Sequence, residues 1–176
     1  MPITQPPPGL GQFPDLIEPV APMTAIGSTL TAALVANTVY LYRFRVLGPV
    51  RVGNGVVYNG ATLGTAHLAI GVYTSDLTTW TLVGATADTA AAGANGLQTI
   101  PFVAPPTLVP GTDYWAAIGA TDGTYTLLRA PSIVSGALGG LKNRSLLKAG
   151  VYAAGLPATI TAPAGASLPL YLALTA

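Results

Sequence analysis

The stretch AHLAIGVYTSDLTTWTLVGATA, residues 66–87, constrains the fold more than any other part of the sequence. Side chains in a strand point alternately to opposite faces. Here Leu68, Ile70 and Val72 alternate with His67, Ala69, Gly71 and Tyr73, which gives one continuously apolar face. A polar turn at residues 74–79 follows, and a second strand runs from Trp80 to about Ala87. We therefore expect a β-hairpin at the centre of an all-β fold.

Strand-like segments recur on both sides of this hairpin. The clearest is TVYLYRFRV, residues 38–46, and the sequence ends with leucines at 168, 170, 172 and 174. Further candidates lie at 29–36, 50–59, 97–103, 112–120, 124–129, 145–154 and 158–162. About 8–10 strands at roughly ten-residue spacing, without a convincing helix, predict a single antiparallel β-sandwich or jelly roll.

Local signals refine this prediction. Asn54-Gly55 favours a hairpin turn, so residues 50–59 form either one strand or a hairpin. Asp122-Gly123 predicts a hairpin between 112–120 and 124–129. Pro101 cannot donate to a sheet ladder, so its strand belongs at an edge or a bulge.

The first 28 residues differ in composition from residues 29–176, which we expect to form the sandwich. Seven prolines fall in this segment, which favours an extended or polyproline II arm that cannot join a sheet interior. One interpretation is a flexible leader. The other is an arm that lies on a partner surface and buries the apolar side chains Leu10, Phe13, Leu16, Ile17, Val20 and Met23.

Charge is scarce, with seven basic and six acidic residues in 176. So few charges predict either a very stable protein with an uncharged surface or a surface largely covered by partners, and we favour the second interpretation. The near-zero net charge argues against nucleic-acid binding, which needs a basic face, and against a polybasic membrane anchor.

The sequence contains no cysteine, which excludes disulfides and thiolate metal sites. The N-terminus lacks the basic start and apolar core of a secretory signal, and prolines interrupt the long uncharged stretches, so we expect no membrane span.

No catalytic constellation stands out. His67 is the only histidine, too few for the common zinc sites, and we expect it to lie on a strand face without a catalytic role. The acids fall mainly in the arm and in turns, where aspartate bonds to the local backbone, although a calcium site built from loop oxygens stays an alternative. No phosphate-binding glycine motif is present. We therefore expect neither enzymatic activity nor a cofactor.

Two surface features offer candidate contacts. Trp80 lies at the edge of a loop, where an indole ring can stack on a sugar, whereas Trp115 alternates within a strand and belongs to the core or the sheet surface. Arg43, Arg45, Arg51 and the basic residues in 142–148 either meet an acidic partner or are simply solvated. Trp80 is thus the candidate for contact with a glycan or another partner.

Several segments in succession resemble the β-sandwich domains of tailed-bacteriophage virion proteins, which occur in head decoration proteins, head fibres and tail fibres. The segments are TVYLYRFRV, HLAIGVYTSDLTTWTLVGATA, LQTIPF and LVPGTDYWAAIGATDG. The matching signals are a G-V-Y strand that ends in a polar turn and an L-x-P-G-T-x-Y strand start, Leu108 to Tyr114. Carbohydrate-binding modules share these features. The resemblance covers about residues 29–130.

This resemblance implies a non-enzymatic structural protein made in the host cytoplasm and placed on the virion surface. A short chain with one sandwich and an arm fits a capsid decoration or cement protein on the capsid exterior. Its partners would be the major capsid protein or another virion protein and other copies of itself, with a trimer implied by the resemblance alone. The alternative is a tail-tip or fibre module that binds host-surface glycan.

Overall fold

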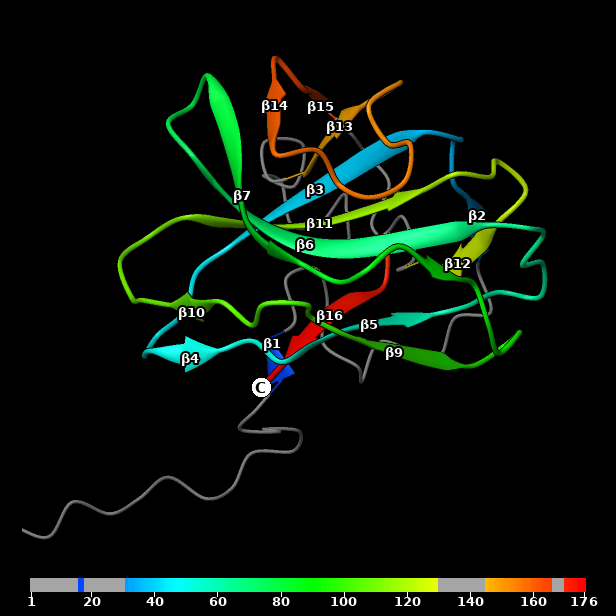
Figure 1. Ribbon diagram of the computed structural model, residues 1–176, viewed down its shortest axis with the longest axis horizontal. Coiled ribbons are helices and arrows are strands. Elements are labelled where there is room, and N and C mark those ends of the chain that lie inside the picture. The colour runs from blue at the N-terminus through cyan, green and yellow to red at the C-terminus, as the bar shows by residue number, and fades with distance from the viewer. Residues whose placement is uncertain (1–15, 18–30, 130–144, 166–169) are drawn as a thin grey trace, which may run out of the picture.

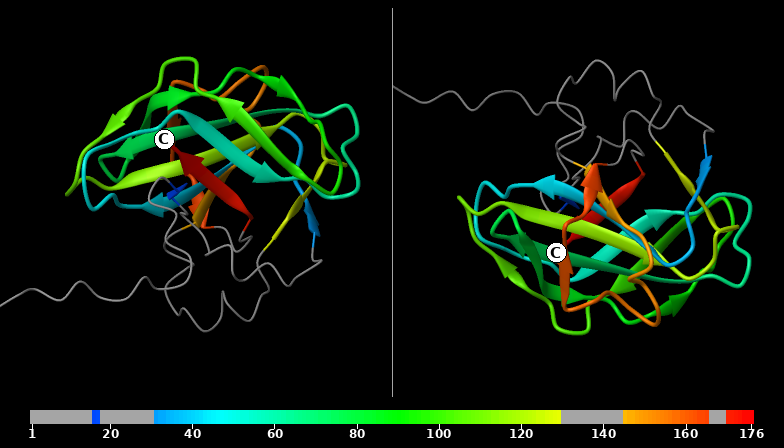
Figure 2. Two further views of the ribbon diagram at one scale, coloured as in Figure 1. Left: turned by 90° about the horizontal axis from the view of Figure 1, so that it is seen from below. Right: turned by 90° about the horizontal axis from the view of Figure 1, so that it is seen from above.

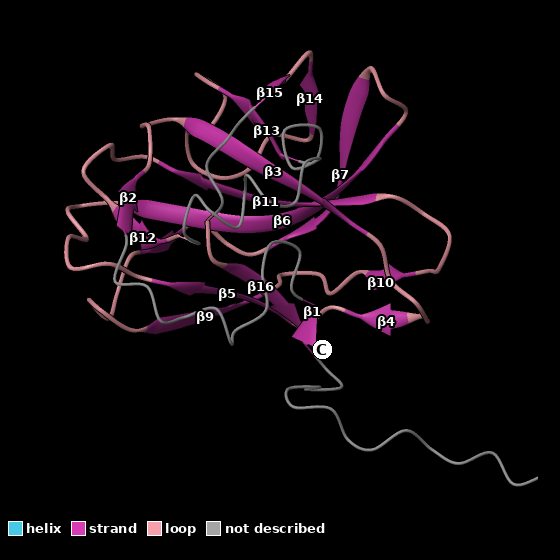
Figure 3. Ribbon diagram, turned by 180° about the vertical axis from the view of Figure 1, so that it is seen from behind, coloured by secondary structure: helices cyan, strands magenta, loops and turns pink. Residues whose placement is uncertain are grey.

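The computed structural model of this protein describes residues 16–17, 31–129, 145–165 and 170–176, and these residues contain strands and no helix (Figure 3). The strands are β1 (Leu16–Ile17), β2 (Thr31–Ala33), β3 (Thr38–Phe44), β4 (Val50–Arg51), β5 (Asn54–Tyr58), β6 (His67–Ser75), β7 (Thr79–Ala85), β8 (Thr89–Ala90), β9 (Leu97–Pro101), β10 (Thr107–Leu108), β11 (Tyr114–Ala120), β12 (Thr126–Leu128), β13 (Ser145–Lys148), β14 (Thr159–Thr161), β15 (Ala164–Gly165) and β16 (Leu172–Thr175). The predicted all-β class is confirmed.

The larger sheet has the order β14-β7-β6-β11-β3-β13-β15, and β8 also pairs with β6. All these pairs are antiparallel. The predicted central hairpin is present as β6 and β7, with a register irregularity between Val72 and Tyr73. The middle of the sheet is β11, which pairs along its whole length with both β3 and β6.

The second sheet has the order β1-β16-β5-β9 and lies against one face of the larger sheet (Figures 1 and 2). The predicted C-terminal strand is confirmed, because β16 pairs with β5 and Leu170, Leu172 and Leu174 are buried. Pro101 ends the edge strand β9, as its missing N–H requires. An isolated bridge between Thr86 and Phe102 joins the two sheets at one corner.

The main core fills the space between the two sheets. Alternate residues of the long strands point into it, including Tyr40, Tyr42 and Phe44 of β3 and Leu68, Ile70 and Val72 of β6. Gly55 of β5 faces Ile70 so closely that a Cβ at this position would lie 2.6 Å from the isoleucine side chain. Glycine at this position therefore permits close approach of the two sheets.

This packing explains why the hairpin alternative for residues 50–59 is wrong. Asn54-Gly55 lies inside β5, and β4 pairs with β10 instead of β5. The hairpin predicted at Asp122-Gly123 is wrong as well, since β12 pairs with β2. The Asp122 carboxylate accepts hydrogen bonds from the backbone N–H groups of Thr124 (2.8 Å) and Thr65 (3.2 Å). These bonds fix a turn that leads the chain out of the larger sheet, where Tyr125 and Leu127 enter the main core.

Much of the outer face of the larger sheet is also buried. Residues 149–163 cross it, and β14 pairs with the edge strand β7 (Figures 1 and 2). A second apolar cluster results, formed by Val39, Leu41, Ala69, Tyr73, Trp80, Trp115, Ala117, Tyr152 and Ile160. We call residues 149–163 the outer cap. The molecule therefore has three layers over the middle strands: the smaller sheet, the larger sheet and the outer cap.

Gly119 of β11 makes room for the outer cap. A Cβ at this position would lie 2.2 Å from the ring of Tyr152. Tyr152 is 2% exposed, so the ring has no free space to which it can move.

We expect Gly119→Ala to destabilise the fold by about 1–3 kcal/mol, because the added methyl group overpacks the contact with Tyr152. Chemical denaturation monitored by tryptophan fluorescence measures this change. Gly48→Ala is the matched control, since a Cβ there meets nothing within 4 Å and its stability should stay the same or rise slightly. Equal stability of the two variants would contradict a tightly packed outer cap.

Candidate functional site

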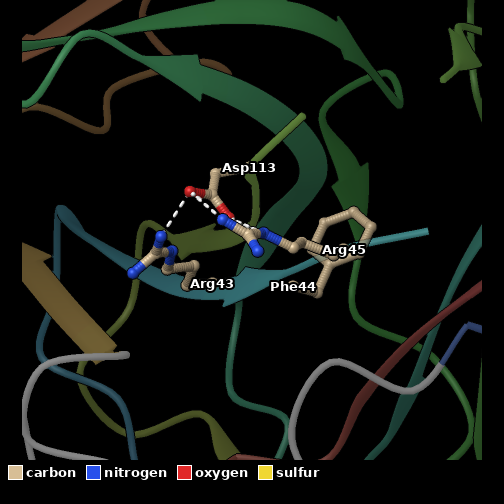
Figure 4. Close-up of a pocket in the computed structure, with 4 residues that line it drawn as sticks. All are labelled: Arg43, Phe44, Arg45 and Asp113. Carbon is tan, nitrogen blue, oxygen red and sulfur yellow. Dashed lines mark hydrogen bonds and ion pairs between the residues drawn. The ribbon is translucent and has the colours of Figure 1, made fainter. Parts of the chain in front are cut away.

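Three charged side chains meet at one end of β3. Arg43 lies in β3 and Arg45 follows its last residue, so the two arginines share the outer face of the sheet. Asp113 immediately precedes β11, in which Tyr114 pairs with Phe44. The same antiparallel register brings Asp113 opposite Arg45. Figure 4 shows both guanidinium groups directed at the carboxylate of Asp113.

The Asp113 carboxylate accepts hydrogen bonds from both arginines. Arg43 Nη2 and Arg45 Nη2 donate to Oδ2, the latter at 3.0 Å, and Arg45 Nε donates to Oδ1. The bonds from Arg45 and then Arg43 hold the pKa of Asp113 far below its usual range. Asp113 in turn raises the pKa of Arg45. The cluster is therefore two cations and one anion, with a net local charge of +1.

An open cavity of about 290 Å³ adjoins this cluster and is lined by Arg43, Phe44, Arg45 and Asp113 (Figure 4). The side chains of Arg43 and Arg45 are 40% and 62% exposed, and that of Asp113 is 29% exposed. The cavity therefore presents guanidinium N–H groups to solvent. This arrangement can bind an anion, and it contains no nucleophile paired with a base.

A second polar cluster centres on Asp88. Its Oδ2 lies 3.1 Å from Nδ1 of His67, and its Oδ1 accepts a hydrogen bond from the Tyr152 hydroxyl. Burial is the main cause of a raised pKa for Tyr152, and the bond to Asp88 adds to it. His67 lies exposed on β6, as the sequence predicted. Because Tyr152 lies in the outer cap, its hydrogen bond to Asp88 fastens the cap to the loop between β7 and β8.

The aspartates predicted to lie in turns are found there. Asp76 accepts hydrogen bonds from the backbone N–H groups of Thr78 (2.9 Å) and Thr79 (2.7 Å) in the β6–β7 turn. Asp122 plays the same part after β11. Among the residues that the structure describes, no group of three or more His, Asp or Glu side chains is placed to hold a metal ion.

Trp80 requires a correction. It does lie beside the turn, as predicted, but its side chain is only 6% exposed and belongs to the second apolar cluster. Its ring meets that of Trp115 edge-on at a centroid distance of 5.6 Å. A stacking platform needs an open ring face, which Trp80 lacks in this structure. Contact of Trp80 with a glycan stays a prediction that requires the outer cap to move.

Of the predicted arm residues, Leu16 and Ile17 form β1, which pairs antiparallel with β16 at the edge of the smaller sheet. Leu10, Phe13, Val20 and Met23 lie outside the described residues, as do residues 142–144 of the basic cluster. Across the described ranges, no helix has the length and apolar character needed to cross a bilayer.

Sequence reasoning singled out Arg43 and Arg45 but not their link to Asp113. This link could have been inferred by pairing the two strongest predicted strands, 38–46 and 112–120, in antiparallel fashion. Such a pairing places Asp113, at the start of the second strand, beside the arginines at the end of the first. The link between His67 and Asp88 was missed because it depends on a loop conformation. No protein-family model matches the chain, and no curated protein matches it significantly.

We expect Tyr152→Phe to destabilise the fold by about 1–3 kcal/mol, because it removes a hydrogen bond to a carboxylate from a buried position. Tyr58→Phe is the matched control, since the Tyr58 hydroxyl donates to the Asn95 carbonyl (2.9 Å) at an exposed site and should matter less. Urea denaturation of both variants measures the difference. If Tyr152→Phe is as stable as the unmodified protein, Asp88 does not fasten the outer cap.

Asp113 should make a small, pH-dependent contribution to the free energy of unfolding. Its pKa is lowered in the folded state, so its contribution is present above the unfolded pKa of about 3.9 and is lost as pH falls through the folded value. Because the ion pairs are exposed, this contribution should be about 0–1 kcal/mol. The difference in unfolding free energy between the unmodified protein and Asp113→Asn should shrink from about pH 5 to pH 2. Parallel pH curves for the two proteins would contradict this assignment.

Proposed function

We propose that this chain is a non-enzymatic structural protein of a bacteriophage virion, most simply a decoration protein that attaches to the capsid exterior and stabilises the shell. The proposal is supported by the resemblance of its strand sequences to virion β-sandwich domains and by the all-β fold. It is also supported by the charge-poor surface, which suits contact with other proteins better than a free monomer.

The observation that carries the proposal is the position of β1. Leu16–Ile17 pairs with β16 at the outside of the smaller sheet, beside the C-terminus (Figure 1). Of residues 1–28, Leu16 and Ile17 are the ones that the structure describes, and they join the sandwich as a two-residue edge strand. We infer that a segment attached through an edge strand can contact a partner without opening the core.

Several large apolar side chains among the described residues are also exposed. Leu47 is completely exposed, and Leu77, Val103 and Val35 are more than half exposed. Burial of such area at the joints between capsid subunits would stabilise a shell at roughly 25 cal/mol per Å², before the cost of association is subtracted.

The glycan-binding alternative is weaker at Trp80, because that ring is covered by the outer cap. A tail-tip or fibre protein with this fold would need a different contact surface. The location of the protein on the particle therefore separates the two hypotheses.

Immunogold electron microscopy of intact particles tests the location. We expect label over the heads, because a decoration protein covers the capsid exterior. Label confined to the tail end would replace the decoration hypothesis with the adhesion hypothesis. Particles without label would overturn both.

Deletion of residues 1–24 should abolish attachment to particles while the sandwich stays folded. Because this deletion also removes β1, deletion of residues 1–14 is the matched control, which keeps the pairing of β1 with β16. Loss of co-sedimentation with particles in both variants, with unchanged circular dichroism, would assign attachment to the arm. Normal attachment of both variants would contradict the proposed role of the arm.

A further inference from the structure

The cluster of Arg43, Arg45 and Asp113 is larger than structural stability requires. Exposed ion pairs contribute about 0–1 kcal/mol, yet three of the 13 charged residues of this chain gather at one point. Two arginines so close together repel each other, and Asp113 compensates for only one of the two charges. The cluster therefore costs the chain electrostatic energy that a single arginine–aspartate pair would avoid.

The arginines retain many free donors. Two guanidinium groups carry about ten N–H bonds, and three hydrogen bonds to Asp113 account for only part of them. The bonds to Asp113 also fix the direction of both planar groups, which lowers the entropy cost of binding a ligand. Figure 4 shows the two guanidinium groups side by side, converging on one carboxylate; Arg43 comes from β3 and Arg45 from the residue after its end.

The adjoining cavity sets the size of the ligand. Its volume of about 290 Å³ is at the lower end for small-molecule sites and suits a single ring. Its lining consists of Arg43, Arg45 and Asp113 together with Phe44, whose side chain is buried in the main core, so the wall of the cavity is mainly polar. A sugar offers several hydroxyl oxygens, which can accept hydrogen bonds from the remaining N–H donors.

The charge sets the class of ligand. A net charge of +1 is matched by one carboxylate, which guanidinium groups bind in a planar geometry with two hydrogen bonds. A dianionic phosphate would exceed this charge. We propose that Arg43 and Arg45, oriented by Asp113, bind the carboxylate of an acidic sugar, such as one uronic acid unit of an acidic polysaccharide.

Arg43, Arg45 and Asp113 lie outside residues 1–28, so this site would give the protein a second contact beyond the attachment proposed above. The carboxylate would lie against both guanidinium groups, and the sugar ring would occupy the adjoining cavity. Asp113 is a positioning residue here, since it holds the arginines and sets the local charge without binding the ligand itself.

Titration of the full-length protein with D-glucuronate, followed by NMR of the arginine Nε–H groups and by calorimetry, tests the proposal. We expect saturable binding of glucuronate and none of D-glucose, which lacks the carboxylate. Arg43→Met combined with Arg45→Met should weaken binding roughly tenfold or more, the effect of losing charged hydrogen bonds. Arg51→Met is the matched control, because it removes an exposed arginine outside the cavity lining and should bind normally.

Two further measurements keep the test specific. Asp113→Asn raises the local charge to +2 and should shift preference from glucuronate toward inorganic phosphate, an effect that a purely structural ion pair would not produce.

N-acetylglutamate amide serves as a peptide-type carboxylate. Tighter binding of this compound than of glucuronate would overturn the sugar assignment in favour of an acidic protein segment. Unchanged glucuronate binding in the folded double arginine variant would overturn the site itself.

Discussion

Burial of the middle strands on both faces is the constraint on which the rest of the structure depends. β3, β11 and β6 present one set of side chains to the smaller sheet and the other set to the outer cap. A strand that is buried on both faces of its sheet needs apolar or small side chains at successive positions, not only at alternate ones. This requirement explains why every residue of β11 is buried. Burial on both faces also requires small residues where layers approach closely, as at Gly119 beneath Tyr152.

Much of this fold was predictable from period-two alternation. The strands 38–46, 66–87 and 112–120, and the C-terminal leucines, were identified correctly because their patterns are long and regular. The two hairpin predictions failed because a turn signal indicates the local backbone conformation but does not specify which strands pair with each other. Gly55 lies in β5, where the lack of a side chain leaves room for Ile70. The turn at Asp122 leads the chain to β12, which pairs with β2. The extended piece predicted at 158–162 is confirmed as β14. The coverage of the outer face by residues 149–163 was not predicted, because this segment is rich in alanine, glycine and proline and carries little periodic signal.

The candidate site was predictable only in part. Arg43 and Arg45 were visible as two cations on one strand face, but their meaning depends on the register between β3 and β11, which brings Asp113 opposite them. For Trp80 the sequence suggested an exposed side chain, whereas the structure has a buried one. A tryptophan beside a polar turn resembles an exposed aromatic contact, but a segment almost 80 residues later in the sequence covers it, with Ile160 paired opposite it in β14. Long-range coverage of this kind leaves no local signal.

The distribution of charge connects the fold with the way the protein meets partners. Among the described carboxylates, Asp76 and Asp122 bind turn backbones, Asp88 binds Tyr152 and His67, and Asp113 binds the two arginines. Each is committed to an intramolecular bond, so the described surface has little free negative charge to repel or attract a partner. Contacts of the apolar surface should therefore depend weakly on salt. The excess positive charge at Arg43 and Arg45 is the contrasting feature, because it gives one point on this surface where electrostatic attraction can select a ligand.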